Sequence, residues 1–182
     1  MANIDVKQIR IAKRYSEALI DNTDNKQEAQ DIHNQLIFIN QTLISSADLK
    51  AFLENPIISQ QDKTDVINQI FSRNISEKVK NLLFLLIDNN RFDAFAAIVS
   101  EYEARLDELN NVIKARVISA IELNEDAKGR LIQKLESKTS KTVVADYQIN
   151  PQIIAGIIVE INDKTIDTSL KTKLNNIKKQ LI

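Results

Sequence analysis

The stretch "NNVIKARVISAIEL" (residues 110–123) separates two parts of the chain that have different hydrophobic periods. Its residues 113–117 read Ile-Lys-Ala-Arg-Val, which is the alternation of a strand with one buried face. Before this stretch, apolar residues recur at steps of three and four, as they do in amphipathic helices. We therefore predict a mainly α chain, with a helical bundle over residues 1–108 and a small α/β domain over residues 109–182.

Six helices are predicted in the N-terminal part, and no strand pattern occurs among them. Ser46, Ser59 and Ser76 each precede an apolar helical pattern, where a serine hydroxyl can accept hydrogen bonds from free backbone N–H groups. Asn55-Pro56 ends the third pattern, because proline disfavours helix in the residue before it. The predicted helices cover residues 9–20, 28–44, 47–54, 60–71, 77–87 and 92–109.

The C-terminal part mixes strands and helices. After the strand that starts near residue 112, "NEDAKGRLIQKLES" (124–137) is a predicted helix, although Gly129 within it costs ~1 kcal/mol relative to alanine. "KTVVADYQI" (141–149) and "GIIVEIN" (156–162) are predicted strands, and "SLKTKLNNIKKQLI" (169–182) is a predicted final helix.

The segment "GIIVEINDKTIDTSLKTKL" (156–174) gathers acids, hydroxyls and lysines behind a glycine, as a reaction centre would. We interpret it instead as a strand, a turn at "NDKT" and the start of the last helix. Asp167 or Thr168 would then cap that helix by accepting hydrogen bonds from its first N–H groups. Gly156 is predicted to be a structural residue that allows close backbone approach where the turn meets the strand.

Composition argues against several functional classes. The formal net charge is −1, so the chain lacks the basic excess of a nucleic-acid-binding protein. There is no cysteine and one histidine, His33, which leaves too few ligands for a zinc site and gives Ser169 no evident base. Gly129 and Gly156 lie 27 positions apart, too far for a phosphate-binding loop. We expect no catalytic residues, cofactor or metal, although a carboxylate-based site remains an alternative.

The absence of cysteine predicts a reducing compartment, and the start and the apolar runs of the chain predict a soluble protein. The start "MANIDVKQIR" has no apolar core of signal-peptide length, and the longest apolar run, residues 82–87, is far shorter than the ~20 residues of a membrane span. The last twelve residues carry four lysines and no acid. These lysines either complement the helix dipole or form a surface for an acidic partner helix.

Two helices have more apolar surface than a bundle requires. In residues 9–20 apolar side chains span about 200° of the helical wheel, against the ~100° stripe that faces a core. Residues 82–87 are apolar in nearly every direction. Either both helices are interior, or together they leave an exposed groove that accepts an amphipathic helix from another protein.

Five segments, in this order and spacing, resemble the delta subunit of bacterial F-type ATP synthases, the counterpart of the mitochondrial oligomycin-sensitivity-conferring protein. The similarity runs over almost the whole chain. Ser140 and Thr168 depart from the family pattern, which often has glycine at both positions, and both lie at predicted turns. The segments are "AKRYSEALI" (12–20), "LENPIISQQDKTDVINQIF" (53–71), "LLFLLIDNNRFDAFAAIVSEYEAR" (82–105), "ARVISAIEL" (115–123) and "INPQIIAGIIVEINDKTIDTSLKTKL" (149–174).

The resemblance implies a non-catalytic stator subunit at the cytoplasmic face of the bacterial plasma membrane. In that family a groove between the first and fifth helices holds the N-terminal helix of an alpha subunit, and the C-terminal part meets the distal end of the b-subunit stalk. Contact with the membrane is then indirect, and neither nucleic acid nor a small-molecule substrate is expected. A free-standing helical adapter and a small carboxylate-based enzyme are the alternatives.

Residues of the first and fifth helices are the predicted groove residues. Tyr15 and Leu19 form one i,i+4 pair, and Asn81 and Leu85 form the other, so each pair lies on one helix face. Ala18 would let a partner helix approach closely, and Asn81 would supply a polar contact that fixes its register. Interior packing is the alternative role for the apolar members.

Overall fold

The computed structural model describes residues 6–161 and 164–180, which fold into two compact units. The units meet between Asn110 and Asn111, two residues after the boundary expected from the sequence. Each has its own buried core. No described helix combines the length and the apolar character needed to cross a membrane.

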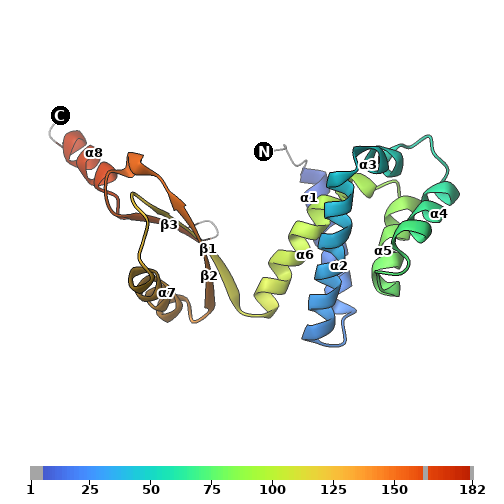
Figure 1. The fold of residues 1–182 in the computed structure, drawn as a ribbon, viewed down its shortest axis with the longest axis horizontal. Helices are drawn as coiled ribbons and strands as arrows, with labels where there is room; N and C mark the ends of the chain where they lie inside the picture. Colours follow the sequence, from blue (N-terminus) through green and yellow to red (C-terminus); the bar gives the residue numbers. More distant parts are fainter. Residues whose placement is uncertain (1–5, 162–163, 181–182) are drawn as a thin grey trace. The chain divides into compact units, whose positions relative to one another are not determined.

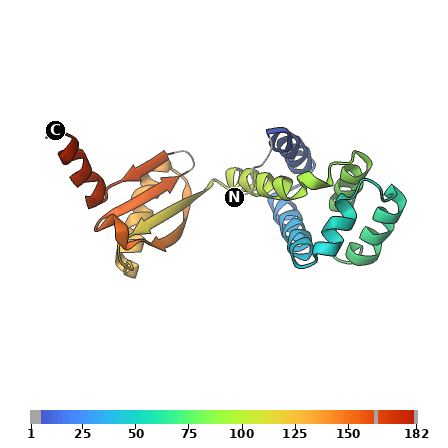
Figure 2. The same cartoon turned by 90° about the horizontal axis from the view of Figure 1, so that it is seen from above.

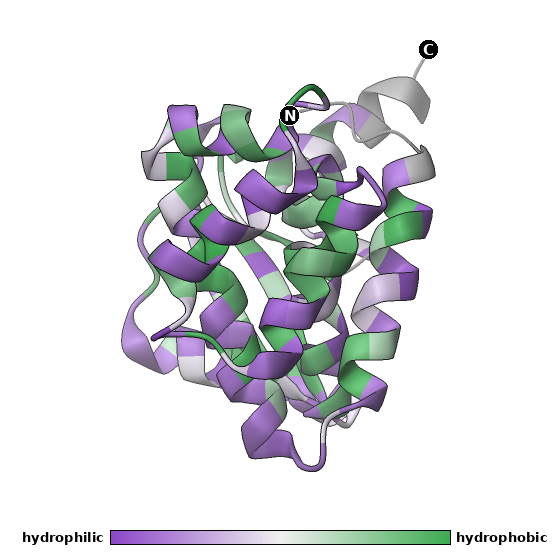
Figure 3. Ribbon diagram, turned by 90° about the vertical axis from the view of Figure 1, so that its right-hand side faces the viewer, coloured by the Kyte–Doolittle hydropathy of each residue, from purple (hydrophilic) through white to green (hydrophobic). Residues whose placement is uncertain are grey.

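The N-terminal unit is built from six α-helices and a short 3-10 helix, and its described residues contain no strand (Figure 1). This agrees with the predicted six-helix bundle. Hydrophobic and hydrophilic bands alternate along the helices, as expected for helices with one face turned inward (Figure 3). The helices are α1 (Val6–Asp21), α2 (Lys26–Ser45), α3 (Ala47–Glu54), α4 (Gln60–Phe71), α5 (Glu77–Asp88) and α6 (Phe95–Leu109), with the 3-10 helix at Phe92–Ala94.

Serine caps fix the starts of three helices at the predicted positions. The hydroxyl of Ser46 caps α3 and that of Ser76 caps α5, each by accepting a hydrogen bond from the N–H three residues on. Ser59 Oγ accepts from Asp62 N at 3.2 Å and donates to Asp62 Oδ2 at 2.7 Å. The aspartate thus binds the serine hydroxyl, where the glutamate of a standard capping box would reach the backbone.

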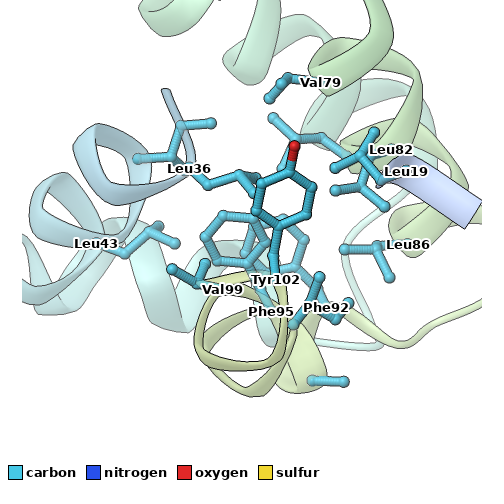
Figure 4. Packing of buried hydrophobic residues seen from close by; sticks show 14 of the residues in the cluster. Leu19, Leu36, Leu43, Val79, Leu82, Leu86, Phe92, Phe95, Val99 and Tyr102 are labelled. Carbon is cyan, nitrogen blue, oxygen red and sulfur yellow. The ribbon is translucent and has the colours of Figure 1, made fainter. Parts of the chain in front are cut away.

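Tyr102 of α6 lies at the centre of the N-terminal core (Figure 4). Its ring is fully buried, and its hydroxyl donates a hydrogen bond to the Ala29 carbonyl of α2 at 3.0 Å. Burial raises the pKa of this phenol to about 12. Because α6 also packs against α1, it joins the first two helices to the rest of the bundle. Other fully buried members of this core are Leu36, Ile39, Leu83, Leu86 and Ile98.

The C-terminal unit contains a mixed sheet in the order β2-β1-β3-β4 (Figure 2). The β1 and β2 strands are parallel, so the chain between them must cross over, and α7 makes that crossover. The β3 strand is antiparallel to β1 and to β4. The elements are β1 (Val112–Ser119), α7 (Glu125–Thr139), β2 (Thr142–Ile149), a 3-10 helix (Pro151–Ile153), β3 (Ile157–Ile161), β4 (Lys164–Asp167) and α8 (Leu170–Gln180).

The predicted half-buried strand is confirmed in β1. Ala115 and Val117 are buried against α7, where Leu135 joins them in the second core. Lys114 and Arg116 are exposed on the opposite face of the sheet. That alternation leaves one face of the sheet covered by a helix and the other polar.

Two details of the segment 156–174 differ from expectation. The residues Lys164–Asp167 form the fourth strand, β4, where the sequence predicted a turn at "NDKT" that leads into the last helix; residues 162–163 of that turn lie outside the described residues. The cap of α8 is Ser169, whose Oγ accepts from Thr172 N at 3.3 Å. Asp167 supports this cap by accepting from Ser169 N at 2.8 Å, and Thr168 does not cap the helix.

Gly156 lies where only glycine fits. Its φ is +90°, and a Cβ built at this position would lie 2.6 Å from the Thr168 carbonyl oxygen. Thr168 Oγ1 in turn donates to the Ile157 carbonyl at 2.7 Å. The start of β3 therefore runs directly against the backbone that leads into α8.

Candidate helix-binding groove

A groove with a volume of about 340 Å³ lies between α1 and α5 in the N-terminal unit. All five residues predicted for such a groove contribute to its walls. The five residues thus line one cavity, and its role as a binding site for a partner helix stays a prediction. The lining residues are Tyr15, Ala18, Leu19, Asn22, Lys78, Asn81, Leu82 and Leu85.

The wall formed by α1 results from small and large side chains on neighbouring faces. Leu19 is buried and belongs to the core, while Tyr15 is half-buried and packs against that core. Ala18 is exposed and carries only a methyl group. A helix placed in the groove could therefore approach the α1 backbone closely at Ala18.

The wall formed by α5 contains the apolar surplus seen in the sequence. Leu82, Leu83 and Leu86 are buried in the bundle core, whereas 48% of Leu85 is exposed. Both interpretations of this helix are therefore partly correct, because it lines the interior and also presents apolar surface to solvent. An exposed leucine beside Ala18 and Tyr15 provides the apolar contact area that a groove requires.

A fixed positive charge lies at one end of the groove. Lys78 Nζ lies 2.7 Å from Glu28 Oε1 and 3.6 Å from Asp24 Oδ2, and it donates to the Asn22 carbonyl at 2.7 Å. Hydrogen bonding to Lys78 lowers the pKa of the Glu28 carboxyl, and the same bond raises the pKa of the lysine. These contacts join α5 to α2 and to the turn after α1 at this end of the groove.

The two asparagines of the groove have different environments. Asn22, just after α1, donates from Nδ2 to the Ala18 carbonyl at 2.8 Å. Asn81 is exposed, and its side-chain amide makes no hydrogen bond with the described residues. Its donor and acceptor are thus available to the backbone or side chain of an occupant.

Sequence reasoning missed Asn22, Lys78 and Leu82 as lining residues. A signal for Lys78 was present, because it precedes Asn81 by three positions and Leu85 by seven, so it lies on the same helix face. Asn22 had the same signal, because it follows Leu19 by three positions and Ala18 by four, although it lies one residue beyond the end of α1.

The residues with catalytic potential are not assembled into a reaction site in the described structure. The His33 ring stacks on Tyr102 with centroids 6.4 Å apart, and its Nδ1 lies 3.5 Å from the Gln30 side-chain amide nitrogen. Ser169 is buried and caps α8, far along the chain in the other unit. Within the described residues, no group of three or more His, Asp or Glu could hold a metal ion.

The chain is similar to known proteins over nearly its whole length. A model of the family described as "ATP synthase delta (OSCP) subunit" matches residues 11–181. The ATP synthase subunit delta of Flavobacterium psychrophilum is 31% identical over 172 residues, covering 94% of this chain and 97% of the relative. The chloroplastic ATP synthase subunit delta of Gracilaria tenuistipitata is 34% identical over 169 residues, covering 92% and 91%.

A similarity of fold extends to a solved structure. The chain superimposes on a chain in the cryo-EM structure of the Toxoplasma gondii mitochondrial ATP synthase hexamer with a TM-score of 0.67. The match covers 93% of this chain and 96% of that chain, at 19% sequence identity.

Proposed function

Because the chain belongs to the ATP synthase delta (OSCP) subunit family, we propose that it is a non-catalytic stator subunit that links the catalytic head of an F-type ATP synthase to its peripheral stalk. The observation that carries this proposal at the level of residues is the groove between α1 and α5. In the proposed role the chain performs no chemistry, and its task is to hold two other proteins together against a torque.

The N-terminal unit binds the N-terminal helix of an alpha subunit in this groove. Leu85 and Tyr15 supply apolar surface, Ala18 permits close approach, and Asn81 offers an unused amide. This combination suits an amphipathic helix with apolar residues at three- and four-residue spacing. The polar end at Lys78 then limits how far the apolar face of that helix can extend.

The C-terminal unit binds the distal end of the b-subunit stalk. Two observations on α8 support a helical and acidic partner: Leu170 and Leu174 are both at least 40% exposed, and Lys171 and Lys173, both exposed, lie between them in the sequence. The other lysines of this helix, Lys178 and Lys179, have side chains outside the described residues. With b anchored in the membrane, the chain would lie at the cytoplasmic face of a bacterial plasma membrane.

The mechanical role sets a requirement on binding strength. A stator must keep the head from turning with the rotor, so that proton-driven rotation is converted into ATP synthesis. A tether of this kind has to remain bound through many turnovers. A nanomolar Kd corresponds to about −12 kcal/mol, which a well-packed apolar helix in a groove can reach.

The proposal is tested by binding of a synthetic alpha-subunit N-terminal peptide to the full chain, measured by isothermal titration calorimetry. Ala18→Asp should abolish binding, because a carboxylate would be buried unpaired beneath the peptide. Ala51→Asp, at an exposed position of α3, is the matched control and should bind normally. Circular dichroism should show unchanged helix content in both variants. Normal affinity of Ala18→Asp would show that the groove is not the binding site.

A further inference from the structure

The two ends of the α1–α5 groove differ in their chemistry. Lys78 Nζ donates to the Asn22 carbonyl, so these two lining residues mark one end of the groove. Asn22 directly follows α1 whereas Lys78 is in the first turn of α5, so the two helices run in opposite directions along the groove. Tyr15 and Leu85, seven residues away along each helix, therefore line the other end.

The side-chain donors at the Asn22–Lys78 end are already used within the chain. An ammonium group has three N–H donors, and that of Lys78 faces Glu28 Oε1 at 2.7 Å, the Asn22 carbonyl at 2.7 Å and Asp24 Oδ2 at 3.6 Å. The Asn22 amide donates from Nδ2 to the Ala18 carbonyl. Neither lining side chain has a donor left for a carbonyl or a carboxylate of an occupant.

An acceptor at the same end remains free. Both carboxylate oxygens of Glu28 are engaged, because Oε1 faces Lys78 and Oε2 accepts from Asp24 N at 2.7 Å. Only Oδ2 of Asp24 faces the lysine, and 86% of this side chain is exposed, so its other oxygen can accept a hydrogen bond from an occupant. Two carboxylates surround one ammonium here, so this end of the groove is also negatively charged.

The opposite end of the groove has the converse character. The Tyr15 hydroxyl makes no hydrogen bond with the described residues, so its O–H group can donate to an occupant. One helical turn beyond the lining residues, the groove continues along Ile11 and Asn89, which are uncharged. Arg14 and Asp88, exposed on either side of these positions, carry opposite charges. This end thus offers a donor and has no excess of negative charge.

A helix has matching requirements at its own two ends. Its first turn has N–H groups that lack acceptors and a partial positive charge, whereas its last turn has carbonyl groups that lack donors and a partial negative charge. We propose that Asp24 sets the direction of the partner helix, whose first turn lies against Asp24 and whose last turn points towards Tyr15, so that the helix runs parallel to α5. This inference rests on the proposed function, since it takes the alpha-subunit N-terminal helix as the occupant.

The direct test uses the synthetic alpha-subunit N-terminal peptide with a nitroxide spin label on a cysteine at either its first or its last residue. The peptide is bound to the 15N-labelled full-length chain, which has no cysteine of its own that could take up the label. A label on the first residue should broaden the amide signals of Asp24 and Lys78 most strongly, and a label on the last residue those of Ile11 and Asn89. The reverse pattern, or equal broadening at both ends from either label, would overturn the proposal.

A substitution tests the part played by Asp24 itself. Asp24→Asn should weaken peptide binding by about two- to fivefold at low ionic strength, the change expected for one charge near a helix terminus. The difference from the wild type should shrink in about 0.5 M sodium chloride, because exposed charges are screened. Asp48→Asn, at an exposed position of α3, is the matched control and should bind normally in both salts. Wild-type affinity of Asp24→Asn at low salt would overturn the role of this carboxylate.

Failure of the direction and failure of the groove give different results. A peptide that does not bind, or that binds Ala18→Asp as well as the wild type, would overturn both the groove and the direction. A peptide that is blocked by Ala18→Asp, yet shows the reverse broadening pattern, would leave the groove in place and overturn the direction alone.

Discussion

Leu85 and Leu86 are adjacent in α5, yet 48% of Leu85 is exposed on the wall of the groove while Leu86 is fully buried in the bundle core. Successive residues of a helix point about 100° apart, so one helix can present apolar surface both to its own core and to solvent. Substitutions at the two positions therefore test different properties: Leu85 bears on binding of a partner, and Leu86 bears on the stability of the fold.

Leu85→Ala should weaken binding of the alpha-subunit peptide by about fivefold, since roughly 1 kcal/mol of apolar burial is lost in the complex. The free energy of unfolding should change by less than about 0.5 kcal/mol, because the side chain is half exposed. Leu86→Ala, the matched control, should cost about 2–5 kcal/mol of stability by leaving a cavity. Calorimetry and urea unfolding give the two quantities. Equal effects of the two substitutions on stability would contradict the assignment of Leu85 to the groove.

Replacing each of the two glycines by alanine should change the stability in opposite directions. Gly156→Ala should destabilise the C-terminal unit by at least about 2 kcal/mol, because it combines a positive φ with a Cβ that meets the Thr168 carbonyl. At Gly129 a Cβ meets nothing within 4 Å, and the helix propensity of alanine should stabilise α7 by up to about 1 kcal/mol. Amide NMR signals during urea unfolding report each unit separately. Loss of signals from α1–α6 in Gly156→Ala would argue against two independent cores.

Ser140 and Thr168 both depart from the family pattern, and replacing each by glycine should change the stability in opposite directions. Ser140 follows α7 with φ +55°, where glycine avoids the cost of a left-handed residue, so Ser140→Gly should stabilise by about 1 kcal/mol. Thr168→Gly should destabilise by a similar amount, because Thr168 Oγ1 bonds both the N–H and the carbonyl of Ile157. Chemical unfolding followed by circular dichroism measures both changes. A stabilising Thr168→Gly would mean that this hydrogen-bonded pair contributes nothing.

The ion pair at the end of the groove predicts a dependence of stability on pH. Lys78 holds the pKa of the Glu28 carboxyl below its ordinary value of 4.5, so the pair stabilises the fold above that pH and loses this contribution as the pH falls through the lowered pKa. The melting temperature of Glu28→Gln should therefore lie below that of the wild type near neutral pH, and the gap should close in acid. Glu108→Gln, at an exposed position of α6, should show no such convergence. A gap that persists below the lowered pKa would exclude this mechanism.

The groove was predictable because α5 has more apolar residues than its own core can cover. Six successive apolar residues at 82–87 cannot all face one core, so at least one must face outward, and Leu85 does. The face of α1 followed from Tyr15 and Leu19 in the same way. Asn22 continues the same face three residues after Leu19, so its place in the groove could also have been predicted.

The missed strand and the misplaced cap have a common cause. In β4 every residue is exposed, so the segment 164–167 shows no buried face for an alternating pattern to reveal. Once Asp167 belongs to a strand, the start of α8 moves one residue beyond the predicted candidates, to Ser169. Likewise, Lys63 follows a surface capping box in the sequence, and nothing local shows that its side chain turns inward.

The position of β1 in its sheet determines how the C-terminal unit resists a pull. This strand begins at Val112, right after the junction with the first unit, and its register pairs it with eight residues of β2 and five of β3. A pull directed along β1 would strain both flanking ladders together in shear, so their hydrogen bonds would not break one at a time. The strand that follows the junction is thus the one paired on both sides over most of its length.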